Sequence, residues 1–436
     1  MADVRAFRGV TYNPAHVDLS RVLCPPYDVV SPEQQVAYYD RDLRNAIRVV
    51  LNLGEGDERY RDASNNLDMW FADGSLLRAR RPAFYVHRHT FDAPGVGRVS
   101  RSGFVAAVRL EPWSDGAVLP HEHTMPGPKL DRLALTRATN TDTEPIWVFQ
   151  PDPSGAVRAR IPEVIGRTPL LEATFTPVAG SDGDTPSPEE HALWVIDDEE
   201  EVGQLSRLLS AEQLYIADGH HRYETALVHA EEVGGGADDA TRFKTMLITP
   251  LEDPGLLVLP THRLLKLPPG RTLGGMLSQL RTWGWTSEQP VGLAELQARL
   301  ALPAAYGRVG IGLFAERRFS YFEGLVASPE VESLPPSVRA LDVAQVHEGI
   351  LGPLLGLDRE VADAGVLIAY SRDPGEVRAR VASGEFDAGL FLRPPTLEQV
   401  QAVADSRSVM PHKSTYFWPK PPSGLLLALE EPGEDL

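Results

Sequence analysis

The alternation of apolar and polar residues predicts a chain that mixes helices with strands. "AFYVHRHTF" and "RSGFVAAVRLEPW" alternate with a period of two around a glycine-containing loop, which predicts an antiparallel pair of strands. The apolar run "NAIRVVLNL" is predicted as a strand, and "ASNNLDMWFADG" is predicted as a helix. These elements place the N-terminal third in the mixed α/β class.

Local start and stop signals support two helices. Ser31 is a good N-cap, Pro32 suits the first helical position, and Gln34 completes a capping box, so a helix is predicted from Pro32. Further along, "LYIA" is predicted as a buried strand and "RYETALVHAEEV" as a helix that ends at three consecutive glycines. The chain between these two elements therefore makes a strand-turn-helix connection.

The pattern restarts beyond Lys266 with alternating helices and strands, which predicts a second α/β domain. The expected division is 1–265, a nucleotide-binding core, and 266–436, a C-terminal domain that closes on the site. A length of 436 residues agrees with two hydrophobic cores. The segment 154–200 is rich in Pro, Gly, Asp and Glu, and is expected to be a surface elaboration, although "HALWVIDD" within it is predicted as a strand.

Composition narrows the function. The net charge of −19 and the lack of a basic run argue against a nucleic-acid partner. Cys24 is the only cysteine, which excludes an internal disulfide and a CxxC centre and fits a reducing cytoplasm. Because neither a signal peptide nor a run of about 20 apolar residues is present, a cytoplasmic protein without a membrane partner is expected.

The first candidate site is "YIADGHHRYETA". Asp218 and Gly219 form a turn at the end of a strand, and a helix begins near His221, so backbone N–H groups and the helix dipole favour an anion there. His220, His221 and Arg222 add donors, and an Arg side chain can bind phosphate through two hydrogen bonds. We expect a phosphate site; the alternative is a solvated surface turn.

The second candidate site is "PHEHTMPGPKLDRL". His121 and His123 would share one side of an extended segment and Glu122 the other, so the pair could bind a metal or Glu122 could act as a general base. A third zinc ligand is not visible. The structural alternative is that Glu122 caps a helix or pairs with Lys129 or Arg132.

The third candidate site is "MPHKSTYFWPKPPSGLL". Lys413, Ser414, Thr415 and Lys420 combine cations with hydroxyls, which suits phosphate or carboxylate recognition, although an edge strand with extended lysines gives the same pattern. The phosphate-loop motif GxxxxGK[ST] and the dinucleotide motif GxGxxG are both missing, which argues against a P-loop NTPase and a Rossmann dehydrogenase.

Taken together, these stretches resemble the family called domain of unknown function 1015. The matching stretches extend from Pro25 to Lys420 and are "PPYDVVSPE", "HEHTMPGPKLDRL", "YIADGHHRYETA", "EDPGLLVLPTHRLL", "LDVAQVHEGIL" and "MPHKSTYFWPK". "PHE", "ADGHHR" and the run that ends in "MPHKST" are also similar, more distantly and in the same order, to the free-serine kinases of the ParB/sulfiredoxin-like superfamily. That resemblance implies a ParB/sulfiredoxin-like nucleotide-binding core followed by the second α/β domain.

The resemblance also implies roles for individual residues. Glu122 corresponds to the catalytic carboxylate and Asp218 to the residue that assists it. The nucleotide phosphates would be held by Gly219, His220, His221, Arg222, Lys413, Ser414 and Thr415, and the substrate by His121, His123 and Thr124. A sulfiredoxin is excluded because His220 stands where that enzyme has its reactive cysteine, and the acidic chain argues against a DNA-binding ParB protein.

The expected function is therefore a kinase that transfers a phosphoryl group from ATP or ADP to L-serine. Mg²⁺ would enter with the nucleotide, with Asp218 as a further ligand but no dedicated metal site. Three alternatives stay open: a ParB-like nucleotide switch without an amino-acid acceptor, a metal-dependent hydrolase built on His121, His123 and His220 or His221, and a non-catalytic partner protein. Asp28, in "PPYDVVSPE", would either add a ligand or support the helix start at Ser31.

Overall fold

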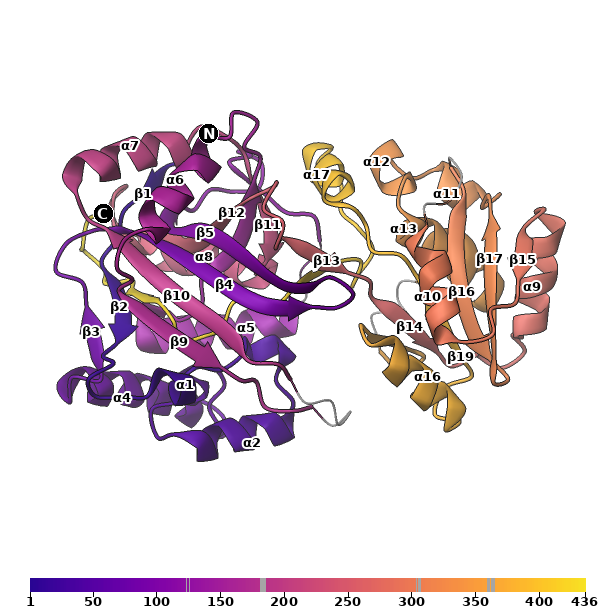
Figure 1. Ribbon diagram of the computed structural model, residues 1–436, viewed down its shortest axis with the longest axis horizontal. Helices are drawn as coiled ribbons and strands as arrows, with labels where there is room; N and C mark the ends of the chain where they lie inside the picture. Colours follow the sequence, from indigo (N-terminus) through magenta and orange to yellow (C-terminus); the bar gives the residue numbers. More distant parts are fainter. Residues whose placement is uncertain are drawn as a thin grey trace. The chain divides into compact units, whose positions relative to one another are not determined.

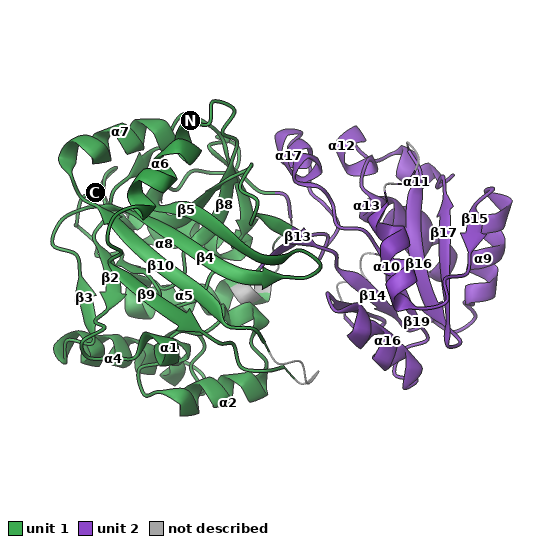
Figure 2. Cartoon of the chain, in the orientation of Figure 1, with its two compact units in different colours: residues 1–120, 124–257, 419–436 green, residues 121–123, 258–418 purple. Residues whose placement is uncertain are grey.

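The chain forms two compact units, which the computed structural model shows in Figure 2. Unit 1 contains Met1–Pro120, Thr124–Leu257 and Pro419–Leu436, and unit 2 contains His121–His123 and Val258–Trp418. The structure describes all residues except 123, 125, 181–185, 303, 305–306, 359–360 and 362–364, together with the side chains of 126 and 128. Both units combine helices with strands, so the fold class is mixed α/β as the sequence predicts.

Unit 1 is built on a large twisted sheet of nine strands among the described residues (Figure 1). The strands follow the order β6-β11-β8-β12-β5-β4-β10-β9, and β1 pairs with β5. Their bounds are β1 Val4–Arg5, β4 Phe84–Ala93, β5 Gly97–Arg109, β6 Val118–Leu119, β8 Ile146–Gln150, β9 Leu171–Phe175, β10 Glu189–Ile196, β11 Leu214–Asp218 and β12 Phe243–Pro250.

Alternation along the strands gives this sheet its main core. Phe84 and Val86 of β4 and Phe104 and Ala106 of β5 are buried in one apolar cluster, since every second side chain points to the same face. Three helices contribute residues to that cluster: α6 Ala156–Ile165, α7 Glu199–Leu209 and α8 His220–Val233. The predicted pairing of "AFYVHRHTF" with "RSGFVAAVRLEPW" is confirmed as β4 and β5.

Seven further helical segments and a smaller sheet complete the described part of unit 1. The helices are α1 Leu19–Val22, η1 Tyr27–Val29, α2 Pro32–Arg41, α3 Ile47–Val50, α4 Glu58–Ala72, α5 Pro126–Thr139 and η2 Ala240–Arg242. The smaller sheet has the order β3-β2-β21-β7, with bounds β2 Gly9–Tyr12, β3 Leu76–Arg78, β7 Thr141–Asp142 and β21 Leu427–Leu429. Strand β21 lies close to the C-terminus, so the last segment of the chain is part of the fold of unit 1.

Unit 2 has a six-stranded sheet among its described residues, in the order β15-β17-β16-β19-β14-β18. The strands are β14 His262–Leu265, β15 Thr286–Glu288, β16 Val309–Ala315, β17 Arg318–Gly324, β18 Ile368–Ser371 and β19 Ala388–Phe391. A two-stranded sheet pairs β13 Leu257–Leu259 with β20 Tyr416–Trp418. The helical segments are α9 Leu273–Thr282, α10 Leu293–Ala301, α11 Pro329–Glu332, α12 Pro336–Arg339, α13 Asp342–Val346, η3 His347–Leu351, α14 Gly352–Leu355, α16 Pro374–Ala382 and α17 Leu397–Asp405.

Two expectations from the pattern were wrong. The run "NAIRVVLNL" forms the helix α3, because Asn45 accepts a hydrogen bond from the Ile47 amide and fixes the start of a helical turn. Residues 154–200 do more than decorate the surface, since β10 pairs with both β4 and β9 inside the large sheet. A short apolar run fits a buried helix as well as a strand, which explains the first error.

The predicted start of α2 is confirmed: Ser31 and Gln34 form a complete capping box and Pro32 begins the helix. Gly234 ends α8 in the left-handed conformation, as the glycine run predicts. None of the described helices has both the length and the apolar composition that a bilayer crossing requires.

Candidate functional site

The first group of candidate residues lies at the connection between β11 and α8 in unit 1. Strand β11 ends at Asp218, Gly219 adopts φ 108°, and α8 begins at His220. The left-handed conformation favours glycine, and a Cβ at this position would also lie 3.2 Å from Nε of Arg222. Because Gly219 is the N-cap and has no side chain, it cannot cap the first N–H groups of the helix. The predicted strand-turn-helix arrangement is therefore present.

The carboxylate of Asp218 lies between two cations. Its Oδ2 is 2.6 Å from Nη2 of Arg222, and its Oδ1 is 2.6 Å from Nζ of Lys420. Burial acts to raise the pKa of Asp218, but Lys420 and Arg222 outweigh burial and hold that pKa well below its usual range. Asp218 is therefore ionised at neutral pH, and it fixes both cations beside the turn.

Arg222 is used inside the fold as well as at the turn. Its Nη1 donates to the backbone carbonyls of Glu144, at 3.1 Å, and Pro145, at 2.8 Å. Burial acts to lower the pKa of Arg222, but Asp218 and Glu144 outweigh it, so the guanidinium stays charged. Arg222 thus ties α8 to the start of β8.

The segment "PPYDVVSPE" takes part in the same group. Asp28, in η1, forms an ion pair with Lys420, whose side chain is 9% exposed. Tyr27 beside it lies under the guanidinium of Arg132, 4.0 Å from ring centroid to Cζ, and burial raises the pKa of Tyr27 to about 12. Asp28 therefore positions Lys420, and the sequence alone did not assign it this role.

The second group lies in unit 2 and joins the segment around Glu122 to the C-terminal motif. Thr415 Oγ1 donates a hydrogen bond of 2.9 Å to Oε1 of Glu122, and Nε2 of His121 lies 2.9 Å from the same hydroxyl. Because that hydroxyl gives its only proton to Glu122, it accepts from His121, which fixes the imidazole proton on Nε2. The Met410 amide donates to the His121 carbonyl, 2.9 Å away, and holds the two segments in register.

Hydrogen bonds hold the turn that precedes Thr415 in the C-terminal motif. Lys413 is exposed and adopts φ 56°, and the buried Ser414 hydroxyl donates 2.5 Å to the Pro411 carbonyl. Buried Arg263 donates from Nη2 to the Lys413 carbonyl, 3.1 Å away, and from Nε to Nε2 of His347. Ser414 thus shapes the turn, while Arg263, which sequence reasoning missed, fastens it to strand β14.

The remaining predicted residues divide as follows. Thr124 donates 2.6 Å to Glu224 on α8, and Lys129 forms an ion pair of 2.8 Å with the same carboxylate. Thr124 therefore helps to anchor α8 in unit 1. His220 is buried and His221 is half-buried in the first turn of α8, whereas His123 lies outside the described residues. Glu224 lies about 100 residues from Thr124 in the sequence, so no local pattern pointed to this anchor.

The fold and these residues define a two-unit mixed α/β protein with a helix N-terminus suited to an anion. The family model described as "Protein of unknown function (DUF1015)" matches residues 4–344, and the chain belongs to this family. No match was found among curated proteins.

Three solved structures show a distant likeness. A free serine kinase in complex with AMP has 14% identity, and the likeness covers 69% of this chain and 83% of that chain at a TM-score of 0.34. A conserved hypothetical protein from Pyrococcus furiosus has 13% identity, with 70% and 90% covered and a TM-score of 0.32. SbnI with a C-terminal truncation, from Staphylococcus aureus, has 11% identity, with 75% and 90% covered and a TM-score of 0.34.

Proposed function

We propose that this protein transfers a phosphoryl group from a nucleotide to the hydroxyl of free L-serine and releases O-phosphoserine. The observation that carries the proposal is the hydrogen bond from Thr415 Oγ1 to Glu122 Oε1, at 2.9 Å. It supports the proposal because Glu122 here binds an alcohol O–H at the distance at which a general base acts, about 2.6–3.2 Å. The hydroxyl of serine requires this same interaction.

In the proposed reaction, Glu122 orients the serine hydroxyl and takes its proton as the oxygen attacks phosphorus. His121 supports this role, since it is buried and holds Thr415 in place through the hydrogen bond to Oγ1. His123 and Thr124 are assigned to the substrate by the motif resemblance alone. The same resemblance, through "PHE" and "ADGHHR", is the reason for naming serine as the acceptor.

Residues 218–222 are proposed to receive the nucleotide phosphates. The N-terminus of a helix of 14 residues directs N–H groups and positive potential toward an anion, and Gly219 leaves room for its approach. Lys420 and the first-turn residues His220 and His221, all in unit 1, add positive charge or donors for a transition state whose charge lies on phosphoryl oxygens. Lys413 is assigned to the phosphates by the motif resemblance alone. Asp218 acts through Lys420 and Arg222, which makes it a positioning residue in this scheme.

Mg²⁺ commonly accompanies nucleotide phosphates and is held by one or two carboxylates together with phosphate oxygens. Both oxygens of Asp218 already face the nitrogens of Arg222 and Lys420. The carboxylate in this arrangement does not fit a direct Mg²⁺ ligand, so no step is assigned to a metal at Asp218. We retain Mg²⁺ with ATP or ADP as the proposed form of the donor.

Acceptor dependence tests the proposal. Purified protein is incubated with Mg²⁺ and either ATP or ADP, with L-serine, with L-alanine or without an amino acid, and nucleotide consumption is followed by chromatography. We expect consumption with L-serine and background rates with L-alanine, which lacks the hydroxyl. Consumption at one rate in all three mixtures would instead indicate a nucleotide-hydrolysing switch.

A further inference from the structure

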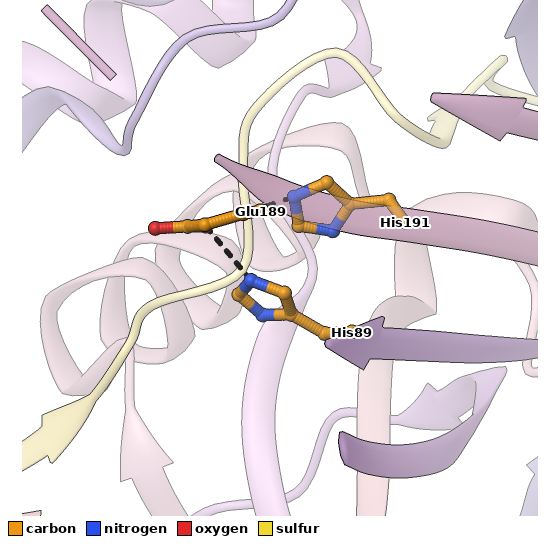
Figure 3. Close-up of side chains that lie close together, drawn as sticks. All are labelled: His89, Glu189 and His191. Carbon is orange, nitrogen blue, oxygen red and sulfur yellow. Dashed lines mark hydrogen bonds and ion pairs between the residues drawn. The ribbon is translucent and has the colours of Figure 1, made fainter. Parts of the chain in front are cut away.

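A separate group of side chains in unit 1 gathers three imidazoles and a carboxylate on one face of the large sheet. His87 and His89 belong to β4, and Glu189 and His191 belong to β10. His89 and His191 are direct cross-strand partners, and residues two apart on one strand point to the same face. Figure 3 shows Glu189 reaching toward both His89 and His191.

The distances in this group suit ligands of one ion. Oε2 of Glu189 lies 2.8 Å from Nε2 of His89 and 3.7 Å from Nε2 of His191. The ligand atoms of the three residues all lie within 4.8 Å of one another. Two ligands about 2.1 Å from a tetrahedral Zn²⁺ ion are roughly 3.4 Å apart, so the His89 and Glu189 atoms need to separate by only about half an ångström.

The two ring nitrogens of His191 have different surroundings. Its Nδ1 lies 3.2 Å from Nε2 of His87, whereas its Nε2 is buried and has no hydrogen-bond partner among the described residues. If the Nδ1 proton is donated to His87, the Nε2 lone pair faces the Glu189 carboxylate at 3.7 Å. Two electron-rich atoms in a buried site repel each other, and a cation between them removes the repulsion.

We propose that His89, Glu189 and His191 bind one divalent first-row cation of the Zn²⁺ class, and that His87 orients His191. Two histidines and one carboxylate are a common ligand set for zinc and leave a coordination position for water. A hydrogen bond from the second ring nitrogen of a ligating histidine is the usual way in which proteins fix its orientation. Here that bond runs from His191 Nδ1 to His87.

The three imidazoles lie inside the fold, with exposed fractions of 4% for His87, 0% for His89 and 1% for His191. The Glu189 side chain is 16% exposed, so the group also has a side toward solvent.

Arg101 determines what happens at His89 when the cation binds. Its Nη2 lies 3.1 Å from Nδ1 of His89, and since a guanidinium only donates, the His89 proton is on Nε2 and points to Glu189. For Nε2 to bind the cation, this proton moves to Nδ1 and the Arg101 guanidinium turns away from that atom, so that His89 binds as a neutral ring.

Metal binding to the full chain without a histidine tag tests the proposal. Protein is treated with a chelator and dialysed, and Zn²⁺ is titrated by calorimetry while Co²⁺ binding is followed by visible absorption. The variants are Glu189→Gln, His191→Gln and His191→Asn at the ligands and His87→Gln at the orienting residue. His16→Gln, at an exposed histidine outside the group, is the matched control. Circular dichroism verifies that each variant is folded.

We expect one equivalent of Zn²⁺ to bind the wild type and the His16→Gln variant with equal affinity. His87→Gln should bind about 10–100-fold more weakly, as is typical when the partner of a metal ligand is removed, and the ligand variants should bind more weakly still. Failure of the wild type to bind one equivalent, or equal affinity in folded His191 variants, would overturn the proposal and leave a polar network only. A wild type that binds no equivalent of Zn²⁺ overturns the proposal even if the variants do not fold.

Discussion

Glu122 and Asp218 are both carboxylates in candidate motifs, yet their surroundings give them different chemistry. Glu122 accepts a hydrogen bond from a neutral hydroxyl, that of Thr415, and a carboxylate in such a setting can receive a proton. Asp218 lies between two cations, which lower its pKa and make it a poor base. These contacts are the reason why we propose Glu122 as the base and Asp218 as a positioning residue.

Replacing Glu122 with Gln tests the first role. The amide cannot accept the proton of serine, so turnover should fall by about 10²–10⁴-fold, the usual contribution of a general base. Nucleotide binding, measured by calorimetry, should be unchanged. The matched control is Glu398→Gln, at an exposed position on α17, which should keep wild-type turnover. Undiminished turnover in the Glu122 variant would remove this residue from the mechanism.

Replacing Asp218 with Asn tests the second role through stability. Loss of the carboxylate leaves Arg222 and Lys420 without their shared partner, which should reduce the free energy of unfolding at pH 7 by about 3–5 kcal/mol. Because the pKa of Asp218 is lowered in the folded state, its contribution is full above about pH 5 and is lost as the pH falls through the folded pKa.

Urea unfolding of both proteins between pH 8 and the acid limit measures this effect. The difference between wild type and the Asn variant should be constant down to about pH 5 and should shrink below about pH 4, near the pKa of an unfolded Asp. The control Asp68→Asn, at an exposed site on α4, should stay within about 0.5 kcal/mol of wild type. A difference that does not change with pH would contradict the role of the charge.

At the scale of elements, the connection from β11 to α8 depends on one glycine. Gly219 has φ 108° and lies against the guanidinium of Arg222, so it meets both a conformational and a steric demand. The start of α8 and the position of Arg222 both follow from this turn.

Gly219→Ala should therefore lower the free energy of unfolding by about 1–3 kcal/mol, the cost of a strained backbone conformation. It should also weaken nucleotide binding if residues 218–222 hold the phosphates. Gly236→Ala is the matched control, because φ there is not in the left-handed region and a Cβ meets no atom within 4 Å. Equal stability of the two variants in urea would show that the turn tolerates a side chain.

The elements around the candidate residues were predictable where the signal is local. The capping box at Ser31, the strand pair β4 and β5 and the turn at Gly219 each depend on neighbouring residues, and each is confirmed. The partners of the charges were not predictable. Lys420 pairs with Asp28, which is 392 residues away in the sequence. A local sequence pattern cannot predict such a pair.

The cluster of His89, Glu189 and His191 shows the same limit. "HRH" within a strand predicts two histidines, His87 and His89, on one face, but Glu189 and His191 come from β10, in a segment expected to be peripheral. Only the pairing of β10 with β4 brings them together. The apolar run of α3 was misassigned for a different reason: a short apolar run fits a buried helix as well as a strand, and the hydrogen bond from the Ile47 amide to Asn45 favours the helical turn.

At the scale of the molecule, the chain returns to unit 1 at its end. Residues Pro419–Leu436 supply Lys420, strand β21 and Glu430, and buried Glu430 lies 2.8 Å from Lys244. Lys244 also pairs with Asp142, at 2.9 Å. The C-terminal segment thus supplies a carboxylate, that of Glu430, which pairs with a buried cation elsewhere in unit 1.

Removal of residues 419–436 should therefore destabilise unit 1. Lys244 would keep one of its two carboxylate partners, and β2 and β7 would both lose β21. We expect a lower urea midpoint and faster proteolysis of unit 1 than in the full chain. An unchanged midpoint would contradict the structural role of this segment. The Lys420→Met variant of the full chain keeps β21 but lacks the cation, so its urea midpoint measures the effect of losing Lys420 alone.

The most direct test of the proposed function identifies the product. Phosphorus NMR is recorded on the protein with Mg²⁺, L-serine and ATP or ADP, beside a mixture that lacks serine. The proposal predicts a phosphomonoester signal that requires serine and coincides with added O-phosphoserine. Nucleotide binding without this signal, with either donor, would contradict a free-serine kinase.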